Sequence, residues 1–104
     1  MIVKLCNASE LPAPGAMRTF RGHNLQLCVA RPEDAPERIC VFDNRCPHQG
    51  APLNTGHLEG STVVCPYHAW RFDIATGQPQ MPCDPPLITY EARQYDDEIF
   101  IRIP

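Results

Sequence analysis

Four side chains able to bind a transition metal occur in two short segments of this chain. The first segment reads Cys46-Pro47-His48 and the second Cys65-Pro66-Tyr67-His68, so each offers one thiolate and one imidazole. Cysteine and histidine are ligands of both zinc and iron–sulfur clusters. Structural zinc sites more often place two cysteines in one segment and two histidines in the other. The mixed segments therefore favour a two-iron cluster with one iron bound through sulfur and the other through nitrogen, and zinc remains the alternative.

Charge explains what mixed ligands do to such a cluster. Two ferric ions, two sulfides and two thiolates sum formally to zero when the other ligands are neutral imidazoles. Four thiolates would leave a net negative charge, so the mixed cluster accepts an electron more readily, at a potential between about −150 and +300 mV instead of about −400 mV. The added electron is expected on the iron bound by His48 and His68.

The residues around these segments resemble a known family. The run from Cys46 to Leu53, Gly60, the triplet Arg71-Phe72-Asp73 and the pair Thr76-Gly77 are similar to the Rieske-type ferredoxins that serve bacterial oxygenases. This resemblance spans essentially the whole chain. It implies one [2Fe-2S] cluster with four ligands, which are Cys46, His48, Cys65 and His68. It also implies an all-β Rieske fold, with an antiparallel β-sandwich base and an inserted cluster-binding lobe.

The same resemblance predicts an electron carrier rather than an enzyme. A protein of this kind would take single electrons from a flavin-containing NAD(P)H-dependent ferredoxin reductase and pass them to a terminal oxygenase. That oxygenase would be a ring-hydroxylating dioxygenase or a related monooxygenase, which suggests aromatic hydrocarbon catabolism. The alternative is a small Rieske subunit of a larger reductase such as nitrite reductase. A monomer is expected for a shuttle.

Departures from the cytochrome bc-type branch of the family predict a potential at the low end of the range. That branch has an extra cysteine in each ligand loop, and the two form a disulfide; Ala51 and Tyr67 occupy those places here. It also has a serine and a tyrosine whose hydroxyls donate to cluster sulfur, where this chain has Trp70 and Phe72. Hydrogen bonds to sulfur stabilise the reduced cluster.

The rest of the sequence predicts short strands that position the two segments. Alternating apolar residues and turn residues suggest the strands, and the prolines, 12 in 104 residues, leave little room for long helices. The expected strands are 2–6, 17–21, 24–30, 38–42, 62–65, 69–73, 88–93 and 98–102. We expect Ser9-Glu10-Leu11 to form a helical turn, with further turns at Ala75-Thr76-Gly77 and Asp96-Asp97. The length allows one domain, with a cluster-binding lobe at about 43–86 and a base formed by 1–42 and 87–104.

Composition limits the partners. The net charge is −3, with five basic and four acidic residues in 1–40 and four basic and eight acidic residues in 41–104. This uneven charge suggests a partner with a basic docking face. No basic, aromatic-rich stretch suggests nucleic acid. No segment has the length of a membrane span, and no targeting leader is recognisable, so a cytoplasmic location is expected.

The remaining cysteines and histidines are expected to be structural. Cys6, Cys28 and Cys40 fit buried strand thiols, and His57 and His23 fit a surface turn and a hairpin turn. In this family the proline-rich segment from Met81 to Pro86 folds over the cluster, which would bring Cys83 near it without making it a ligand. The docking rim is then expected at Pro47, Gln49, Tyr67 and this segment.

Overall fold

The computed structural model describes residues 1–47, 50–67, 69–81 and 84–104. In these residues it has ten strands and two single-turn 3-10 helices, and no α-helix, so the predicted all-β fold is confirmed. No helix in this described part of the chain is long and apolar enough to cross a membrane. In chain order the elements are β1 (Ile2–Asn7), η1 (Ala8–Glu10), β2 (Met17–Gly22), β3 (Leu25–Ala30), β4 (Cys40–Asp43), η2 (Leu53–Thr55), β5 (His57–Glu59), β6 (Thr62–Val64), β7 (Arg71–Asp73), β8 (Thr89–Tyr90), β9 (Ala92–Tyr95) and β10 (Glu98–Arg102).

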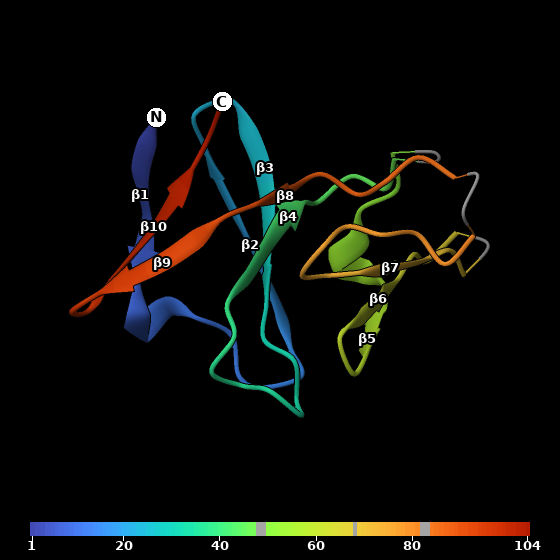
Figure 1. Cartoon of the computed structure of the whole chain (residues 1–104), viewed down its shortest axis with the longest axis horizontal. Helices are drawn as coiled ribbons and strands as arrows, with labels where there is room; N and C mark the ends of the chain where they lie inside the picture. The colour runs from blue at the N-terminus through green and yellow to red at the C-terminus, as the bar shows by residue number, and fades with distance from the viewer. Residues whose placement is uncertain (48–49, 68, 82–83) are drawn as a thin grey trace.

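These strands form three antiparallel sheets. The terminal sheet has the order β1-β10-β9, the central sheet β2-β3-β4-β8 and the small sheet β5-β6-β7. Figure 1 shows the terminal and central sheets on one side of the molecule and the small sheet, with its loops, on the other. The four residues of β4 are all buried, as are four of the six in β3, so the central sheet is covered on both faces.

Two apolar clusters cover these faces. Side chains alternate along a strand, so Val29 and Val41 point toward the terminal sheet and pack with Ile101. Cys28 and Phe42 point the other way, into a cluster that includes Val63 and Phe72 of the small sheet. The central sheet thus anchors the part of the chain that carries Cys46 and Cys65.

The predicted strand at 88–93 is divided in two. Thr89 and Tyr90 pair with β4 in the central sheet, whereas β9 starts at Ala92 and pairs with β10 in the terminal sheet. The chain changes sheets at Glu91. Such a change needs a break in the ladder, which the local sequence does not reveal because both halves have strand-forming residues.

Three expected turns are confirmed. His23 and Asn24 both have positive φ, at 52° and 62°, and form the two-residue turn between β2 and β3. Positive φ at both central residues belongs to the turn type that matches the twist of a hairpin. Asp96, with φ 53°, lies in the turn between β9 and β10, and the expected helical turn near Ser9 is η1.

The interpretation of His57 as a turn residue was wrong. His57 begins β5 and pairs with Val64 of β6, and the turn between these strands lies at Gly60, where φ is 60°. The His57 side chain is exposed and contacts Glu59 at 3.1 Å. A three-residue strand flanked by glycines has too little periodicity to be recognised in a sequence.

Candidate metal centre

Cys46 lies in a short hairpin that follows β4. The two arms pair through the Leu53 N–H, which donates to the Asn44 carbonyl at 2.7 Å, a bridge between Arg45 and Pro52, and the Cys46 N–H, which donates to the Ala51 carbonyl at 2.8 Å. We call residues 44–47 and 50–54 the first ligand hairpin. At its tip the Gly50 N–H donates to the Cys46 carbonyl at 2.7 Å, and Gly50 has a φ of 72° that favours glycine.

Cys65 lies in the corresponding loop between β6 and β7. The Cys65 N–H donates to the Trp70 carbonyl at 2.7 Å, which continues the ladder of the two strands into the loop. The Tyr67 N–H donates to the Cys65 sulfur at 3.4 Å. Ala69 has a φ of 55°, in the left-handed region that residues with a Cβ seldom adopt. We call residues 65–67 and 69–70 the second ligand loop.

The two loops bring the Cys46 and Cys65 thiols together in the interior. Both residues are 1% exposed and neither is in a disulfide. Burial raises the pKa of Cys65, the adjacent Cys46 side chain raises it further, and the Tyr67 N–H lowers it. Iron at this position would stabilise the thiolate form of cysteine, which is the form that binds metal.

The donor set fits an iron–sulfur cluster. The two sulfur ligands predicted from the sequence meet, although they are nineteen positions apart in the chain. The other predicted ligands, His48 and His68, lie outside the described residues, as do Gln49, Pro82 and Cys83. Within the described part of the chain no group of three or more metal-binding side chains occurs.

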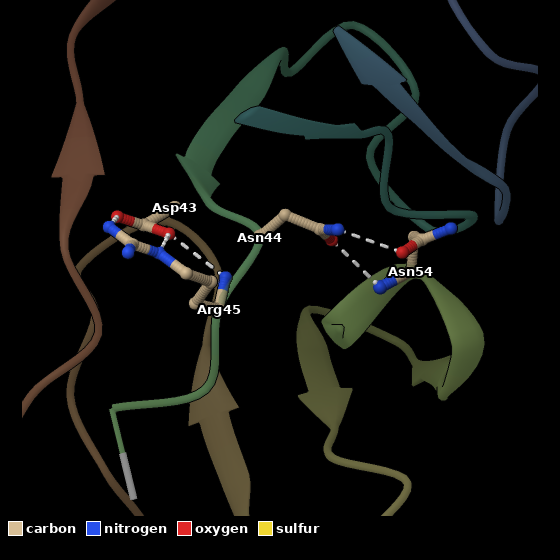
Figure 2. Close-up of polar contacts among 4 residues, drawn as sticks. All are labelled: Asp43, Asn44, Arg45 and Asn54. Carbon is tan, nitrogen blue, oxygen red and sulfur yellow. Dashed lines mark hydrogen bonds and ion pairs between the residues drawn. The ribbon is translucent and has the colours of Figure 1, made fainter. Parts of the chain in front are cut away.

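The residues before Cys46 form two polar contacts on opposite sides of the chain (Figure 2). On one side the Asp43 carboxylate accepts the Arg45 backbone N–H at 2.9 Å and contacts the guanidinium at 3.3 Å. On the other side Asn44 accepts the Asn54 backbone N–H at 2.9 Å and donates from Nδ2 to Asn54 Oδ1 at 2.8 Å. The sequence analysis did not predict these contacts. Their only signal in the sequence is a pair of short polar residues directly after an apolar strand.

The segment after β7 turns back and lies beside β7 of the small sheet. Asp73 Oδ1 accepts the N–H groups of Ala75 and Thr76, which forms the turn expected there, although the turn leads away from β7 and does not join it to β6. The Gln80 N–H then donates to the Arg71 carbonyl at 2.9 Å. Met81 follows directly and is 59% exposed. This part of the proline-rich segment is therefore fixed beside the strand that follows the second ligand loop.

The other described cysteines are structural, as predicted. Cys6 in β1, Cys28 in β3 and Cys40 in β4 are all buried and free of disulfides. Burial raises the pKa of Cys28 to about 12. Within its apolar cluster this thiol packs as a small apolar side chain.

Comparison with known proteins identifies the fold and the centre. The family described as the Rieske [2Fe-2S] domain matches residues 1–91. The 3-phenylpropionate/cinnamic acid dioxygenase ferredoxin subunit of Shigella boydii is 39% identical over 101 residues, which cover 95% of this chain and 91% of that protein. The Sphingomonas yanoikuyae B1 ferredoxin structure has a TM-score of 0.85, 29% identity and full coverage of both chains.

A further structure is the complex of reduced oxygenase and oxidized ferredoxin in carbazole 1,9a-dioxygenase. One chain of it matches with a TM-score of 0.80 and 31% identity, covering 96% of this chain and all of that one.

The chain belongs to the Rieske [2Fe-2S] family. Within that family it is a ferredoxin component of an oxygenase system, an electron-transfer protein and not a catalytic enzyme. It binds one [2Fe-2S] cluster, so the zinc alternative is wrong.

Proposed function

We propose that Cys46 and Cys65 bind one iron of the cluster and His48 and His68 the other. The buried contact between the two thiols is the observation that carries this assignment. A cluster held by these residues would supply one-electron transfer. The chain's own contribution is to hold the donors: the first ligand hairpin and the second ligand loop each fix one cysteine through backbone hydrogen bonds. We further propose that residues 43–86 form a cluster-binding lobe on a base of 1–42 and 87–104.

Serine substitutions test the ligand assignment. Cys46→Ser and Cys65→Ser should each lose most of the iron, inorganic sulfide and visible colour, because an oxygen ligand replaces a thiolate. Cys6→Ser is the matched control, since Cys6 is also buried but lies in β1 of the terminal sheet, and it should keep two irons per chain. Full iron content in either ligand variant would contradict the assignment.

We propose that the protein carries electrons from a flavin-dependent NAD(P)H reductase to a terminal oxygenase, with an aromatic compound as the oxygenase substrate. Support comes from the relatives, one named as a dioxygenase ferredoxin subunit and one present in a complex of ferredoxin with oxygenase. Reconstitution with purified components tests the proposal. Substrate oxidation should require reductase, this protein and oxygenase together, and turnover without this protein would refute it.

We propose that the oxygenase docks on apolar side chains around the ligand loops. Three of the exposed large apolar residues lie in the second ligand loop or beside the strands that lead to the ligand loops: Tyr67 in the second ligand loop, Met81 after β7, and Ile88, whose carbonyl accepts the Asp43 N–H at 2.9 Å. Transient redox complexes bury little area, below about 1,200 Å². Tyr67→Ala should therefore slow electron transfer to the oxygenase without loss of cluster, and the distant Tyr95→Ala, also exposed, should not.

The charge distribution gives less support to a basic partner than the sequence suggested. Of the eight acidic residues in 41–104, four lie in residues 91–98, in and beside the terminal sheet. Asp43 and Glu59 are paired with arginines in the described structure. The negative charge is thus divided between the two ends of the molecule, and we base the docking proposal on the apolar residues instead.

We propose a potential at the low end of the Rieske range. Phe72 lies fully buried in β7 and has no hydroxyl to donate to cluster sulfur. Voltammetry at pH 7 should give one reversible one-electron wave near about −150 mV. A midpoint above about +100 mV, in the upper part of that range, would refute the low-potential assignment.

A further inference from the structure

The side chain of Asn44 adds a further pair of hydrogen bonds between the two arms of the first ligand hairpin. Backbone pairing of the two arms runs from Cys46 with Ala51 back to Asn44 with Leu53. Beyond the pair of Asn44 with Leu53, the side-chain amide of Asn44 continues the pairing of the two arms. It accepts a hydrogen bond from the backbone N–H of Asn54 and donates one to the Asn54 side-chain oxygen (Figure 2). A side-chain amide offers an N–H donor and a carbonyl acceptor, as a peptide group does. It therefore replaces a backbone pair at the open end of the hairpin.

The contacts fix the orientation of this amide. Because the Asn54 backbone N–H can only donate, it requires Oδ1 of Asn44 on that side, at 2.9 Å. The Nδ2 group of Asn44 must then face Asn54, whose Oδ1 accepts it at 2.8 Å. Asn44 is 8% exposed, so its Nδ2 group would lack a good partner if Asn54 were replaced by an apolar residue.

Asn44 also joins the hairpin to the central sheet. Its backbone N–H donates to the Gln26 carbonyl of β3 at 2.9 Å, while its carbonyl and side chain are bonded to Leu53 and Asn54. One buried residue therefore ties both arms of the hairpin to a strand that packs on two faces. Cys46 follows only two positions later. The hydrogen bonds of Asn44 therefore fix the backbone next to a cysteine whose thiol faces Cys65.

We propose that Asn54 is a positioning residue for electron transfer: its amide pair with Asn44 keeps the hairpin that carries Cys46 in one position while the cluster changes charge. This inference rests on the ligand assignment proposed above. Each electron gained or lost alters the charge beside the ligands, and any backbone shift that follows must be made and reversed in every transfer. Hydrogen bonds behind the ligands limit such shifts.

The test compares three variants loaded with two irons per chain. Asn54→Leu removes the acceptor for Asn44 Nδ2 at nearly constant volume, and Asn54→Asp retains an oxygen there. Thr55→Val is the matched control, because it removes a hydrogen bond of the same turn, from the Thr55 hydroxyl to the Pro52 carbonyl at 2.7 Å, that does not involve Asn44. Asn54 and Thr55 are both exposed, so all three variants are expected to fold.

The measurement is the electron self-exchange rate, from NMR line broadening in mixtures of oxidised and reduced protein well below the unfolding temperature. We expect Asn54→Leu to slow exchange about fivefold, the factor that corresponds to one net hydrogen bond. Its reduced electron paramagnetic resonance signal should also broaden. Asn54→Asp and Thr55→Val should match the parent protein.

Two results would overturn the proposal: an Asn54→Leu rate equal to that of Thr55→Val, or equal slowing in Asn54→Leu and Asn54→Asp. A purely structural role would lower the unfolding temperature of Asn54→Leu and leave its exchange rate unchanged, which also counts against positioning. Failure of the ligand assignment would be seen separately, as a Cys46→Ser protein that keeps both irons.

Discussion

Replacing Ala69 by glycine should stabilise this protein, although glycine usually destabilises. Ala69 has a φ of 55° in the second ligand loop. A residue with a Cβ loses about 1–2 kcal/mol in the left-handed region, whereas glycine's extra freedom in the unfolded chain costs about 0.5–1 kcal/mol. The difference predicts a gain of about 0.5–1 kcal/mol in the free energy of unfolding. For a chain of this length that is a rise of roughly 3–6 °C in the midpoint temperature.

The same substitution at Ala75 provides the control. Ala75 lies in the exposed turn after β7, and it is not among the residues with positive φ. Ala75→Gly should therefore lower the unfolding free energy by about 0.5–1 kcal/mol. Both variants would be followed by circular dichroism and by the visible cluster absorption, at equal iron content. Destabilisation by both substitutions would refute the argument that Ala69 is strained.

Substitutions at three other positions test separate parts of the structure. The raised pKa of Cys28, about 12 against an ordinary value of 9.0, means that the folded protein keeps a proton which the unfolded chain releases. Stability should therefore fall as pH rises from about 9 to 12, and Cys28→Val should flatten that fall in denaturant titrations across this window. Asp43→Ala should lower the unfolding free energy by about 1.5–3 kcal/mol, and Asp43→Asn, which keeps an acceptor for the Arg45 N–H, by clearly less; equal losses would show that this hydrogen bond is unimportant. Gly77→Ala should cost more than about 1 kcal/mol, because φ is 80° there and the new Cβ would overlap the Leu87 carbonyl; an unchanged thermal midpoint would contradict this.

The sequence predicted most of what depends on local pattern. The resemblance carried by the residues around Cys46 and Cys65 predicted that both cysteines serve one cluster, and in the structure the two thiols lie together. The hairpin at His23 was predictable because polar residues next to glycine favour the positive φ that a two-residue turn requires. Likewise, the buried thiols at Cys28 and Cys40 followed from their places in apolar strands.

What the sequence did not reveal depends on contacts between distant residues. The change of sheet at Glu91 follows from which partner strand is available on each side, and that is decided by tertiary packing. The short strand at His57 exists because β6 offers it a partner. The pairing of Asn44 with Asn54 joins residues ten positions apart, and neither residue belongs to a recognisable motif.

The two chain ends lie beside one another in the terminal sheet. The Met1 amino group donates to the Ile103 carbonyl at 2.9 Å, and the Ile103 N–H donates to the Met1 carbonyl at 2.8 Å. Figure 1 shows both ends on the opposite side of the molecule from the ligand loops. A tether to an electrode, a label or a fused reductase at either end would therefore leave the loops facing outward. Joining the two ends by a short linker should likewise permit new termini to be opened at the His23 turn without disturbing the cysteines.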